Sequence, residues 1–237
     1  MGVDKGTAKD QAAMAGAEMV EHGMIVGLGS GTTSALMVDC LGERVRSLGL
    51  KITAVATSEA TARQARELGI PLVELDQVQN LDISLDGADE IDGRFAMIKG
   101  LGGALLREKI VAAASRLRVT LITAAKQVEK LGAACPLPVE VSRFGIAHTE
   151  RRLQRLGAVT KIRRSADALV ITDGGNCIID CKFAEIADPA GLDQTIQGLP
   201  GVLETGLFVG LCDVLIIGEA DGVRQIGADR AGRRSTD

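Results

Sequence analysis

Short apolar runs alternate with helix-length segments over the first 130 residues, and this alternation limits the chain to few folds. The runs at 24–28, 52–56, 72–75, 82–85, 95–98 and 119–123 have the length of buried or extended strands. Helical spacing of apolar residues, commonly ended by a glycine, predicts helices over 7–22, 32–48, 58–68 and 104–117. Strands that alternate with helices in this way form parallel sheets with helices on both faces.

The order of predicted strands and helices changes near residues 136–138. Predicted strands at 139–142, 158–163, 168–172, 177–183 and 202–208, with helices at 145–156 and 189–197, follow the order of a split βαβ, ferredoxin-like unit. A strand at 214–217 and a hairpin at 221–222 are expected to rejoin the first sheet, and the polar end, 228–237, is expected to fray. The prediction is an α/β fold: a Rossmann-like catalytic domain with a parallel sheet (1–131 and 208–237, discontinuous) and a smaller α+β ferredoxin-like domain (132–207).

Composition excludes several classes of function. Aromatic residues make up 2% of the chain, without Trp or Tyr, so an aromatic platform for single-stranded nucleic acid is not expected. The formal net charge of −4 provides no basic surface for nucleic acid or an anionic membrane, and no apolar run approaches the length of a membrane span. Five cysteines without a CxxC pair and a charged first segment predict a cytoplasmic protein with reduced, mostly buried thiols.

The first of three loops expected at the carboxyl ends of the strands is rich in glycine and hydroxyl groups. Glycines let the backbone approach an anion, and the start of the next helix offers N–H groups to a phosphate, with Ser30, Gly31, Thr32 and Thr33 as candidates. A dinucleotide-binding GxGxxG motif would need glycine at position 32, and no acidic residue ends the next strand. The remaining alternative is a tight glycine turn with Ser/Thr caps.

The second loop, Asp86-Gly87-Ala88-Asp89-Glu90, concentrates three carboxylates that repel one another unless something binds them. Sugar hydroxyls are suitable partners, because each carboxylate oxygen accepts hydrogen bonds. A magnesium or calcium site is one alternative, although the loop lacks the EF-hand pattern, and an exposed turn is another.

The third loop follows a predicted strand and consists of Lys99, Gly100, Leu101, Gly102 and Gly103. Lys99 is a candidate fixed cation, and Glu108 lies about one turn inside the helix that follows. The alternative for 107–109 is an exposed charge cluster. Two further lysines are candidate partners of a phosphate: Lys126, after the strand 119–123, and Lys9, in the first helix. The alternative is that both are ordinary surface residues.

Taken together, the motifs resemble type A ribose-5-phosphate isomerase in their order over nearly the whole chain. The matching segments are 25–33, 86–91, 98–109, 126–128, 136–141, 199–202 and 206–208. Two positions depart from the family pattern: Leu101 interrupts a run of glycines, and Thr123 stands where the family usually has aspartate.

The resemblance implies an aldose–ketose isomerase that interconverts ribose 5-phosphate and ribulose 5-phosphate in the non-oxidative pentose phosphate pathway. It implies a proton-transferring Glu108 and a polarising Lys99, with Asp86 and Asp89 on the substrate hydroxyls. It further implies substrate contacts from the loops 30–33, 86–89 and 99–102 and from Lys126 and Lys9. The family is cofactor-free, with no metal, and commonly forms homodimers.

Three rival interpretations stay open at this stage. A metal-assisted hydride shift is a mechanistic rival. A non-enzymatic sugar-phosphate sensor of a regulator would normally bring a DNA-binding segment, yet fewer than 25 residues precede the first predicted strand. An acyl-CoA transferase-like enzyme would explain a reactive glutamate but not the aspartate pair or the hydroxyl-rich loop.

Overall fold

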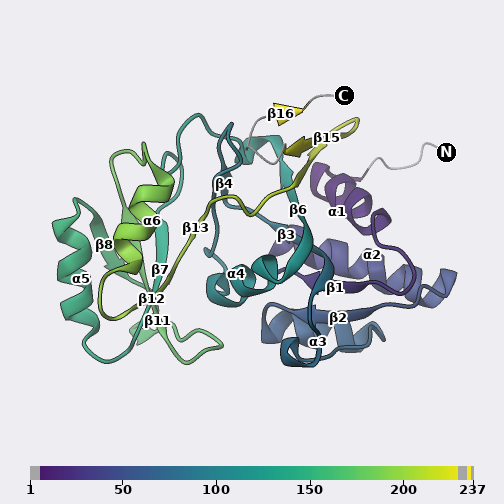
Figure 1. Cartoon of the computed structure of the whole chain (residues 1–237), viewed down its shortest axis with the longest axis horizontal. Helices are drawn as coiled ribbons and strands as arrows, with labels where there is room; N and C mark the ends of the chain where they lie inside the picture. Colours follow the sequence, from purple (N-terminus) through teal and green to yellow (C-terminus); the bar gives the residue numbers. More distant parts are fainter. Residues whose placement is uncertain (1–5, 229–233, 236–237) are drawn as a thin grey trace. The chain divides into compact units, whose positions relative to one another are not determined.

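The alternation of strands and helices expected from the sequence is present in the computed structural model, which describes residues 6–228 and 234–235. The chain divides into unit 1 (Met1–Ala88, Arg107–Lys126 and Leu211–Asp237) and unit 2 (Asp89–Leu106 and Gln127–Gly210) (Figure 1). The domain boundaries expected at 131/132 and 207/208 stay a prediction. Of the tail expected to fray, residues 229–233 and 236–237 lie outside the described residues.

Unit 1 contains most of the predicted helices and parallel strands. In chain order these are α1 (Ala8–Glu18), β1 (Ile25–Leu28), α2 (Thr32–Leu48), β2 (Thr53–Ala56), α3 (Glu59–Glu67), the 3-10 turn η1 (Leu75–Gln77), β3 (Leu81–Gly87), most of α4 (Leu105–Ala113), β6 (Ser115–Thr123), the 3-10 turn η2 (Ala124–Lys126), β14 (Val214–Glu219), β15 (Gly222–Ala228) and β16 (Arg234–Ser235).

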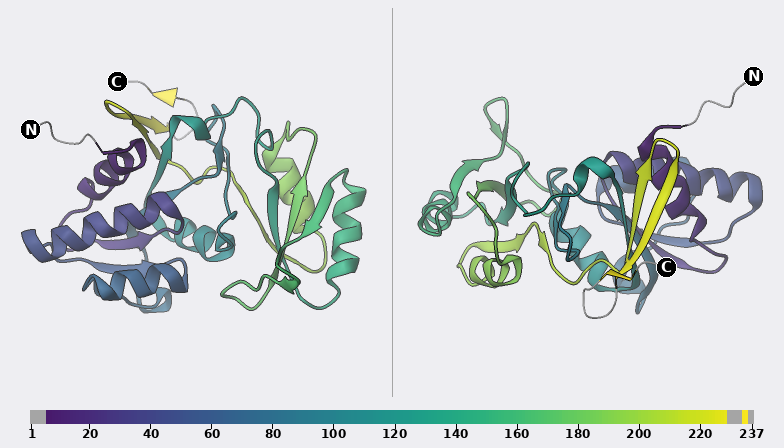
Figure 2. Two further views of the ribbon diagram at one scale, coloured as in Figure 1. Left: turned by 180° about the vertical axis from the view of Figure 1, so that it is seen from behind. Right: turned by 90° about the horizontal axis from the view of Figure 1, so that it is seen from above.

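These strands form one sheet in the order β16-β15-β14-β6-β3-β1-β2. β1 pairs in parallel with β2 and β3, and β6 pairs in parallel with β3 and β14. β14 turns back into β15, and the two form the long yellow hairpin of Figure 2. The expected parallel sheet, rejoined by a strand and hairpin near the carboxyl end, is confirmed.

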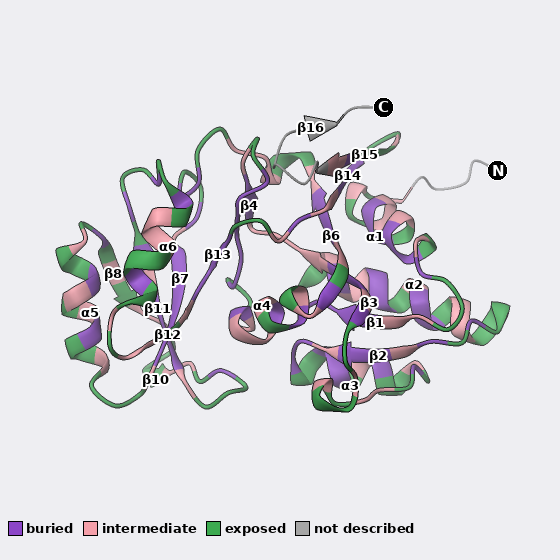
Figure 3. Cartoon of the chain, viewed as in Figure 1, coloured by how far each residue is buried: buried purple, intermediate pink, exposed green. Residues whose placement is uncertain are grey.

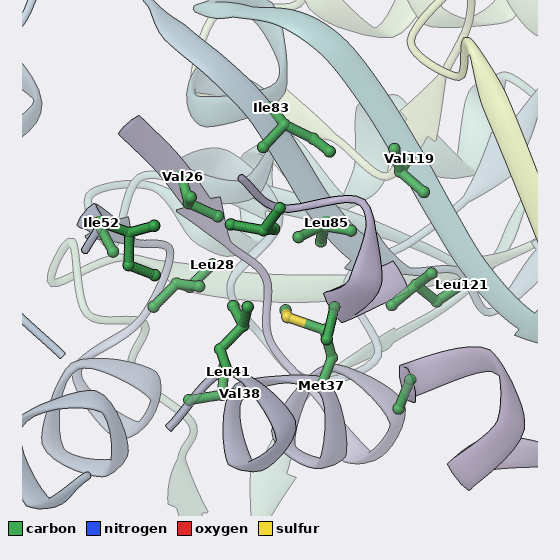
Figure 4. Packing of buried hydrophobic residues seen from close by; sticks show 14 of the residues in the cluster. Val26, Leu28, Met37, Val38, Leu41, Ile52, Ile83, Leu85, Val119 and Leu121 are labelled. Atoms are coloured by element: carbon green, nitrogen blue, oxygen red, sulfur yellow. The ribbon is translucent and has the colours of Figure 1, made fainter. Parts of the chain in front are cut away.

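α1 and α2 lie side by side and bury their apolar faces on the sheet. Figure 4 shows Met37, Val38 and Leu41 of α2 packed toward Val26 and Leu28 of β1. The same cluster includes three buried alanines of α1: Ala12, Ala13 and Ala17. α1 also touches β14, where a Cβ on Gly218 would lie 1.7 Å from the carbonyl oxygen of Ala8.

α4 covers the opposite face of the sheet. Gly27 alternates with the β1 residues that face α2, and a Cβ on Gly27 would lie 2.5 Å from Cγ1 of Val111 in α4. Val111 packs with Val55 and Leu81 in a separate buried cluster. Helices therefore cover both faces, as the α/β prediction requires.

The helix expected over 7–22 ends at Glu18, and two further predicted elements of unit 1 are wrong in extent. The helix expected over 104–117 ends at Ala113, and β6 already begins at Ser115, whose hydroxyl donates to Val111 O at 2.7 Å. The strand expected over 72–75 is reduced to a single bridge between Leu72 and Ala54, and the 3-10 turn η1 follows. Both errors arise because short apolar spacings fit a helix and a strand alike.

An ion pair joins the residue before β14 to the neighbouring strand β6. Asp213 accepts hydrogen bonds from Arg118 Nε and Nη2, both 2.7 Å, and from Arg118 N at 2.8 Å. Burial alone would raise the pKa of Asp213, but the side-chain and backbone hydrogen bonds and the positive charge of Arg118 hold that pKa below its ordinary value. The pair therefore fixes β14 beside β6 and depends on an ionised carboxylate.

Asp213→Asn is expected to lower the free energy of unfolding by about 1 kcal/mol at neutral pH, since the pair is partly exposed. A lowered folded-state pKa stabilises the protein above the unfolded value of 3.8, and the stabilisation is lost as pH falls through the folded pKa. Urea unfolding of both proteins at neutral pH and below pH 3.8 measures the difference. A gap that persists unchanged at the lower pH contradicts the assignment.

Unit 2 is the smaller α+β body. Its elements are β4 (Glu90–Ile91), β5 (Met97–Ile98), β7 (Leu137–Val141), α5 (Ile146–Arg155), β8 (Val159–Ile162), β9 (Arg164–Ser165), β10 (Ala168–Leu169), β11 (Cys177–Lys182), α6 (Pro189–Gln197), β12 (Val202–Thr205) and β13 (Leu207–Phe208). Four strands form an antiparallel sheet in the order β12-β7-β11-β8, with β7 and β11 largely buried (Figure 3). With α5 after β7 and α6 after β11, this is the expected ferredoxin-like order.

The strand expected over 202–208 is interrupted at Gly206, where the chain changes partners. Gly206 N donates to Pro138 O at 2.7 Å, and Gly206 O accepts from Lys99 N at 2.9 Å. A Cβ at this position would lie 2.3 Å from Lys99 O, so only glycine fits. β12 therefore pairs with β7, whereas β13 joins β5 and β4 in a small three-stranded sheet.

Glu90 in β4 is a buried carboxylate with a structural function. It is 1% exposed, and its oxygens accept hydrogen bonds from three backbone N–H groups: Gly132 at 2.6 Å, Ala134 at 2.6 Å and Cys135 at 2.7 Å. The third carboxylate of the 86–90 motif thus binds the chain's own backbone.

The cysteines are free thiols, and four of the five are buried, as expected. Burial raises the pKa values of Cys181 and Cys212 to about 12, so both remain protonated at neutral pH. Among the described residues, no helix combines the length and apolar character needed to cross a membrane.

Candidate functional site

The strand order creates a topological switch point between β1 and β3. The chain passes from β1 outward to β2 and then returns past β1 to β3. In open parallel sheets, ligands bind beyond the carboxyl ends of the strands at such a point, because the loops after the two strands diverge there. The loops after β1 and β3 contain the first and second candidate motifs.

Asp86, near the end of β3, holds the loop after β1. Its Oδ1 accepts hydrogen bonds from Ser30 N at 3.0 Å, Ser34 Oγ at 3.0 Å and Gly87 N at 2.7 Å. Ser30 Oγ lies 2.7 Å from Thr57 Oγ1. The structure therefore joins the Ser30 loop and Asp86 within unit 1, and it gives Asp86 a positioning function that the sequence did not reveal.

The same loop leaves the start of α2 without a side-chain cap. Gly31 occupies the N-cap with a φ of 91°, a conformation that favours glycine, and makes no side-chain cap hydrogen bond. The N–H groups at Thr32 and Thr33 lie at the positive end of the helix dipole. Lys9 Nζ donates to Thr32 Oγ1 at 3.0 Å, which adds a cation. Hydroxyls, an uncapped helix start and an ammonium group suit a phosphate.

Glu108 lies in the first turn of α4 and is only 6% exposed. Its neighbour Arg107 is partly exposed and pairs with Glu59 at 2.9 Å. The Oε2 atom of Glu108 is buried. An exposed charge cluster at 107–109 is therefore the wrong description of Glu108, which is a desolvated carboxylate.

Lys126 is half-buried at the end of η2, directly after β6. Lys126 therefore lies beyond the carboxyl end of a parallel strand, like the loops that follow β1 and β3. Thr123, where the family pattern has aspartate, is the last residue of β6.

In unit 2, Lys99 is a nearly buried cation, 5% exposed. Its backbone N–H donates to Gly206 O, and its Nζ lies 5.3 Å from the centroid of the Phe208 ring. An ammonium group over an aromatic face is attracted by the negative potential of the ring. Phe208 on β13 is a contact that the sequence did not identify, because the partners are far apart in the chain.

The loop after Lys99 is a tight turn. Gly103 N donates to Gly100 O at 3.0 Å, and Leu101 N donates to Asp89 Oδ2 at 3.0 Å. Asp89 and the glycine loop are therefore brought together within unit 2. The Leu101 side chain is 41% exposed, so the larger residue at this position fits without displacing the turn.

Arg163 and Asp180 are further residues that the sequence did not identify. Arg163 donates to Gly100 O and Leu101 O, and it pairs with Asp180 on β11. No motif marks this contact, since its partners lie about sixty residues apart in the chain. Within residues 6–228 and 234–235, no group of three or more His, Cys, Asp or Glu side chains is arranged to hold a metal ion.

Comparisons with known proteins identify the family. Residues 53–222 match the family model described as "Ribose 5-phosphate isomerase A (phosphoriboisomerase A)". The ribose-5-phosphate isomerase A of Gloeobacter violaceus is 50% identical over 222 residues, which cover 93% of this chain and 96% of the relative. That of Cereibacter sphaeroides is 47% identical over 234 residues, which cover 94% and 93%.

Solved structures give the same result. Ribose 5-phosphate isomerase A from Methanocaldococcus jannaschii superposes with a TM-score of 0.89 at 37% identity, covering 93% of this chain and 98% of that chain. A D-ribose-5-phosphate isomerase in complex with phospho-erythronic acid superposes with a TM-score of 0.90 at 35% identity, covering 96% and 100%. This chain belongs to the ribose 5-phosphate isomerase A family.

Proposed function

We propose that this isomerase interconverts D-ribose 5-phosphate and D-ribulose 5-phosphate with Glu108 as the group that moves the proton. The family assignment over nearly the whole chain supports the reaction. The observation that carries the mechanism is the desolvated carboxylate of Glu108 at the start of α4. Burial destabilises the charged form of a carboxylate and so favours its use as a base.

Aldose–ketose isomerisation moves one proton between C1 and C2 through an enediolate. Glu108 removes the proton from one carbon and returns it to the other, which requires hydrogen-bond reach of both. Lys99 and the N–H group of Gly102 stabilise the negative oxygen that develops in the enediolate. The fixed position of Lys99 beside Phe208 supports this function, because a cation that is already oriented needs little reorganisation during the reaction.

The phosphate of the substrate binds at the uncapped start of α2. Ser30, Gly31, Thr32 and Thr33 provide N–H and hydroxyl donors, and Lys9 contributes charge through its contact with Thr32. We assign Lys126 to the same anionic substrate. Binding energy at the phosphate, remote from the reacting carbons, positions the sugar for proton transfer.

Asp86 and Asp89, with the intervening Gly87 and Ala88, contact the sugar hydroxyls in this proposal. Each aspartate also accepts a backbone N–H from a neighbouring loop, Asp86 from Ser30 and Asp89 from Leu101. Their hydrogen bonds hold the carboxylates in place, which supports an orienting function.

The deciding assay is formation of ketose from ribose 5-phosphate by the purified chain, with no cofactor added. We expect turnover that survives exhaustive chelation, since proton transfer by Glu108 requires no metal. Loss of activity on chelation, restored by a divalent ion, would favour the metal-assisted hydride shift. Binding of sugar phosphate without turnover would favour a sensor.

Gly29→Ala is expected to raise KM for ribose 5-phosphate about tenfold, because a Cβ at this position would lie 2.1 Å from Asp86 Oδ1. Asp86 must then move and release the Ser30 loop. Steady-state kinetics measure the change. The matched control is Gly227→Ala in β15, where a Cβ meets nothing within 4 Å. Equal KM values for the two variants would contradict a function of Asp86 in arranging the loop.

We further propose a cytoplasmic homodimer that binds neither nucleic acid nor membranes. The net charge of −4 and the scarcity of aromatic residues support the absence of nucleic-acid binding. Sedimentation equilibrium tests the oligomeric state against the protomer mass of 24.7 kDa.

A further inference from the structure

A guanidinium group from the four-stranded sheet holds the loop that follows Lys99. Arg163, directly after β8, donates from Nη1 to Gly100 O and to Leu101 O, both at 3.0 Å. The other two guanidinium nitrogens bind Asp180 on β11: Nε donates to Oδ2 at 2.9 Å, and Nη2 donates to Oδ1. The carboxylate thus fixes the plane of the guanidinium, and the remaining nitrogen reaches two consecutive carbonyls.

These contacts determine how two peptide groups of the loop are oriented. In a trans peptide, the C=O and N–H bonds point in opposite directions. Because Gly100 O faces Arg163, the N–H of Leu101 points the other way, where Asp89 Oδ2 accepts it at 3.0 Å. Because Leu101 O also faces Arg163, the N–H of Gly102 points away from the guanidinium as well.

The loop needs such contacts because its own sequence restricts it little. Gly100 and Gly103 have φ angles of 99° and 86°, which glycine adopts without cost, and glycine loses more conformational freedom on ordering than other residues. Arg163 and Asp89 hold the Gly100–Leu101 peptide group from its two ends. The side chain of Leu101 takes no part in these contacts, which use the backbone of Gly100 and Leu101.

We infer that Arg163, oriented by Asp180, is a positioning residue for the isomerisation. It sets the orientations of the Gly100–Leu101 and Leu101–Gly102 peptide groups. Asp89 accepts the N–H of Leu101, and the N–H of Gly102 is the group that stabilises the enediolate oxygen. This inference rests on the proposed function and deepens it, because it assigns the preorganisation of a backbone oxyanion donor to a residue outside the recognised motifs. Arg163 acts through the loop and not on the reacting atoms.

Arg163→Ala is expected to lower kcat by about 10- to 100-fold while KM changes little, because loss of alignment near the reacting atoms affects the transition state most. The inhibition constant of inorganic phosphate should not change, since the residues proposed to bind phosphate are intact. Arg163→Lys should lose most of the same activity, because an ammonium group cannot bridge a carboxylate and two carbonyls in one rigid plane. Asp180→Asn should give a smaller decrease.

The matched control is Arg164→Ala, the same change at the next residue. Arg164 is exposed and donates from Nη1 to Asp167 O at 2.8 Å, away from the loop 100–103. The kcat of Arg164→Ala should stay within about twofold of the kcat of the unchanged protein, because most surface substitutions have small effects. Guanidinium added below denaturing concentrations should restore part of the kcat of Arg163→Ala and leave Arg164→Ala unaffected, which a purely structural loss would not do.

The outcomes separate this inference from the proposed function. If the unchanged protein forms no ketose from ribose 5-phosphate, the proposed function fails. If it does, and both Arg163→Lys and Asp180→Asn keep full kcat, only the inference is overturned, even when Arg163→Ala does not fold. Equal losses in kcat and in phosphate affinity, without guanidinium rescue, also overturn it.

Discussion

Replacing Glu108 with glutamine is expected to lower kcat by about 10²- to 10⁴-fold and to leave KM for ribose 5-phosphate near its original value. The amide has the size of the carboxylate but cannot accept the proton that must move between C1 and C2. Glu108 is 6% exposed, so water has little access to replace it as the base. Ketose formation and exchange of the substrate C2 hydrogen with solvent deuterium should decrease together.

The control for this substitution is Glu59→Gln, the same change in an exposed glutamate that pairs with Arg107. A partly exposed ion pair contributes about 0–1 kcal/mol, so Glu59→Gln should leave both the fold and kcat nearly unchanged. Near-normal turnover of Glu108→Gln would remove Glu108 from the mechanism and direct attention to the two aspartates.

The second large effect is expected on stability. Glu90→Ala leaves the buried N–H groups of Gly132 and Cys135 and the partly buried N–H of Ala134 without their acceptor, and each buried loss costs about 1–3 kcal/mol. We expect the free energy of unfolding to fall by at least about 3 kcal/mol, a large part of the total for a domain. Urea denaturation measures the loss, and hydrogen exchange at the three amides should become faster.

Glu185→Ala is the matched control, because Glu185 is an exposed glutamate of the same unit that pairs with Lys130 at 2.8 Å. Its removal should cost less than about 1 kcal/mol. Equal denaturation midpoints for the two alanine variants would mean that water replaces the Glu90 carboxylate at the loop 132–135.

The sequence predicted the elements of this fold better than their ends. Helical spacing identified α2, which buries one face, and a short apolar run identified β1, which is largely buried. The boundary between α4 and β6 was missed because Leu117 lies at helical spacing from the end of α4 and also alternates with Val119 and Leu121 in the strand. At Gly206 the local pattern is strand-like on both sides, and the change of partner strand depends on residues far away in the chain.

Prediction of the candidate site was uneven for a similar reason. Motifs that follow strands could be found from glycines and carboxylates in short segments, and the structure brings Ser30 together with Asp86, and Asp89 with the loop after Lys99. The sequence could not separate the carboxylate Glu90, which binds backbone, from its neighbour Asp89. Nor could it find Arg163, because an arginine that follows a strand gives no local sign of the carbonyls that it will bind.

The position of β14 has a consequence for synthesis of the chain. β14 pairs with β6 and packs against α1, yet the whole of residues 127–210 is made between β6 and β14. During synthesis, α1 and the edge of β6 therefore remain without their partner β14 until the final segment has been made. Exposed strand edges promote self-association. A nascent chain that stops before Val214 would be prone to aggregate, so premature termination near the end of the message yields an aggregating product and not a slightly shortened enzyme.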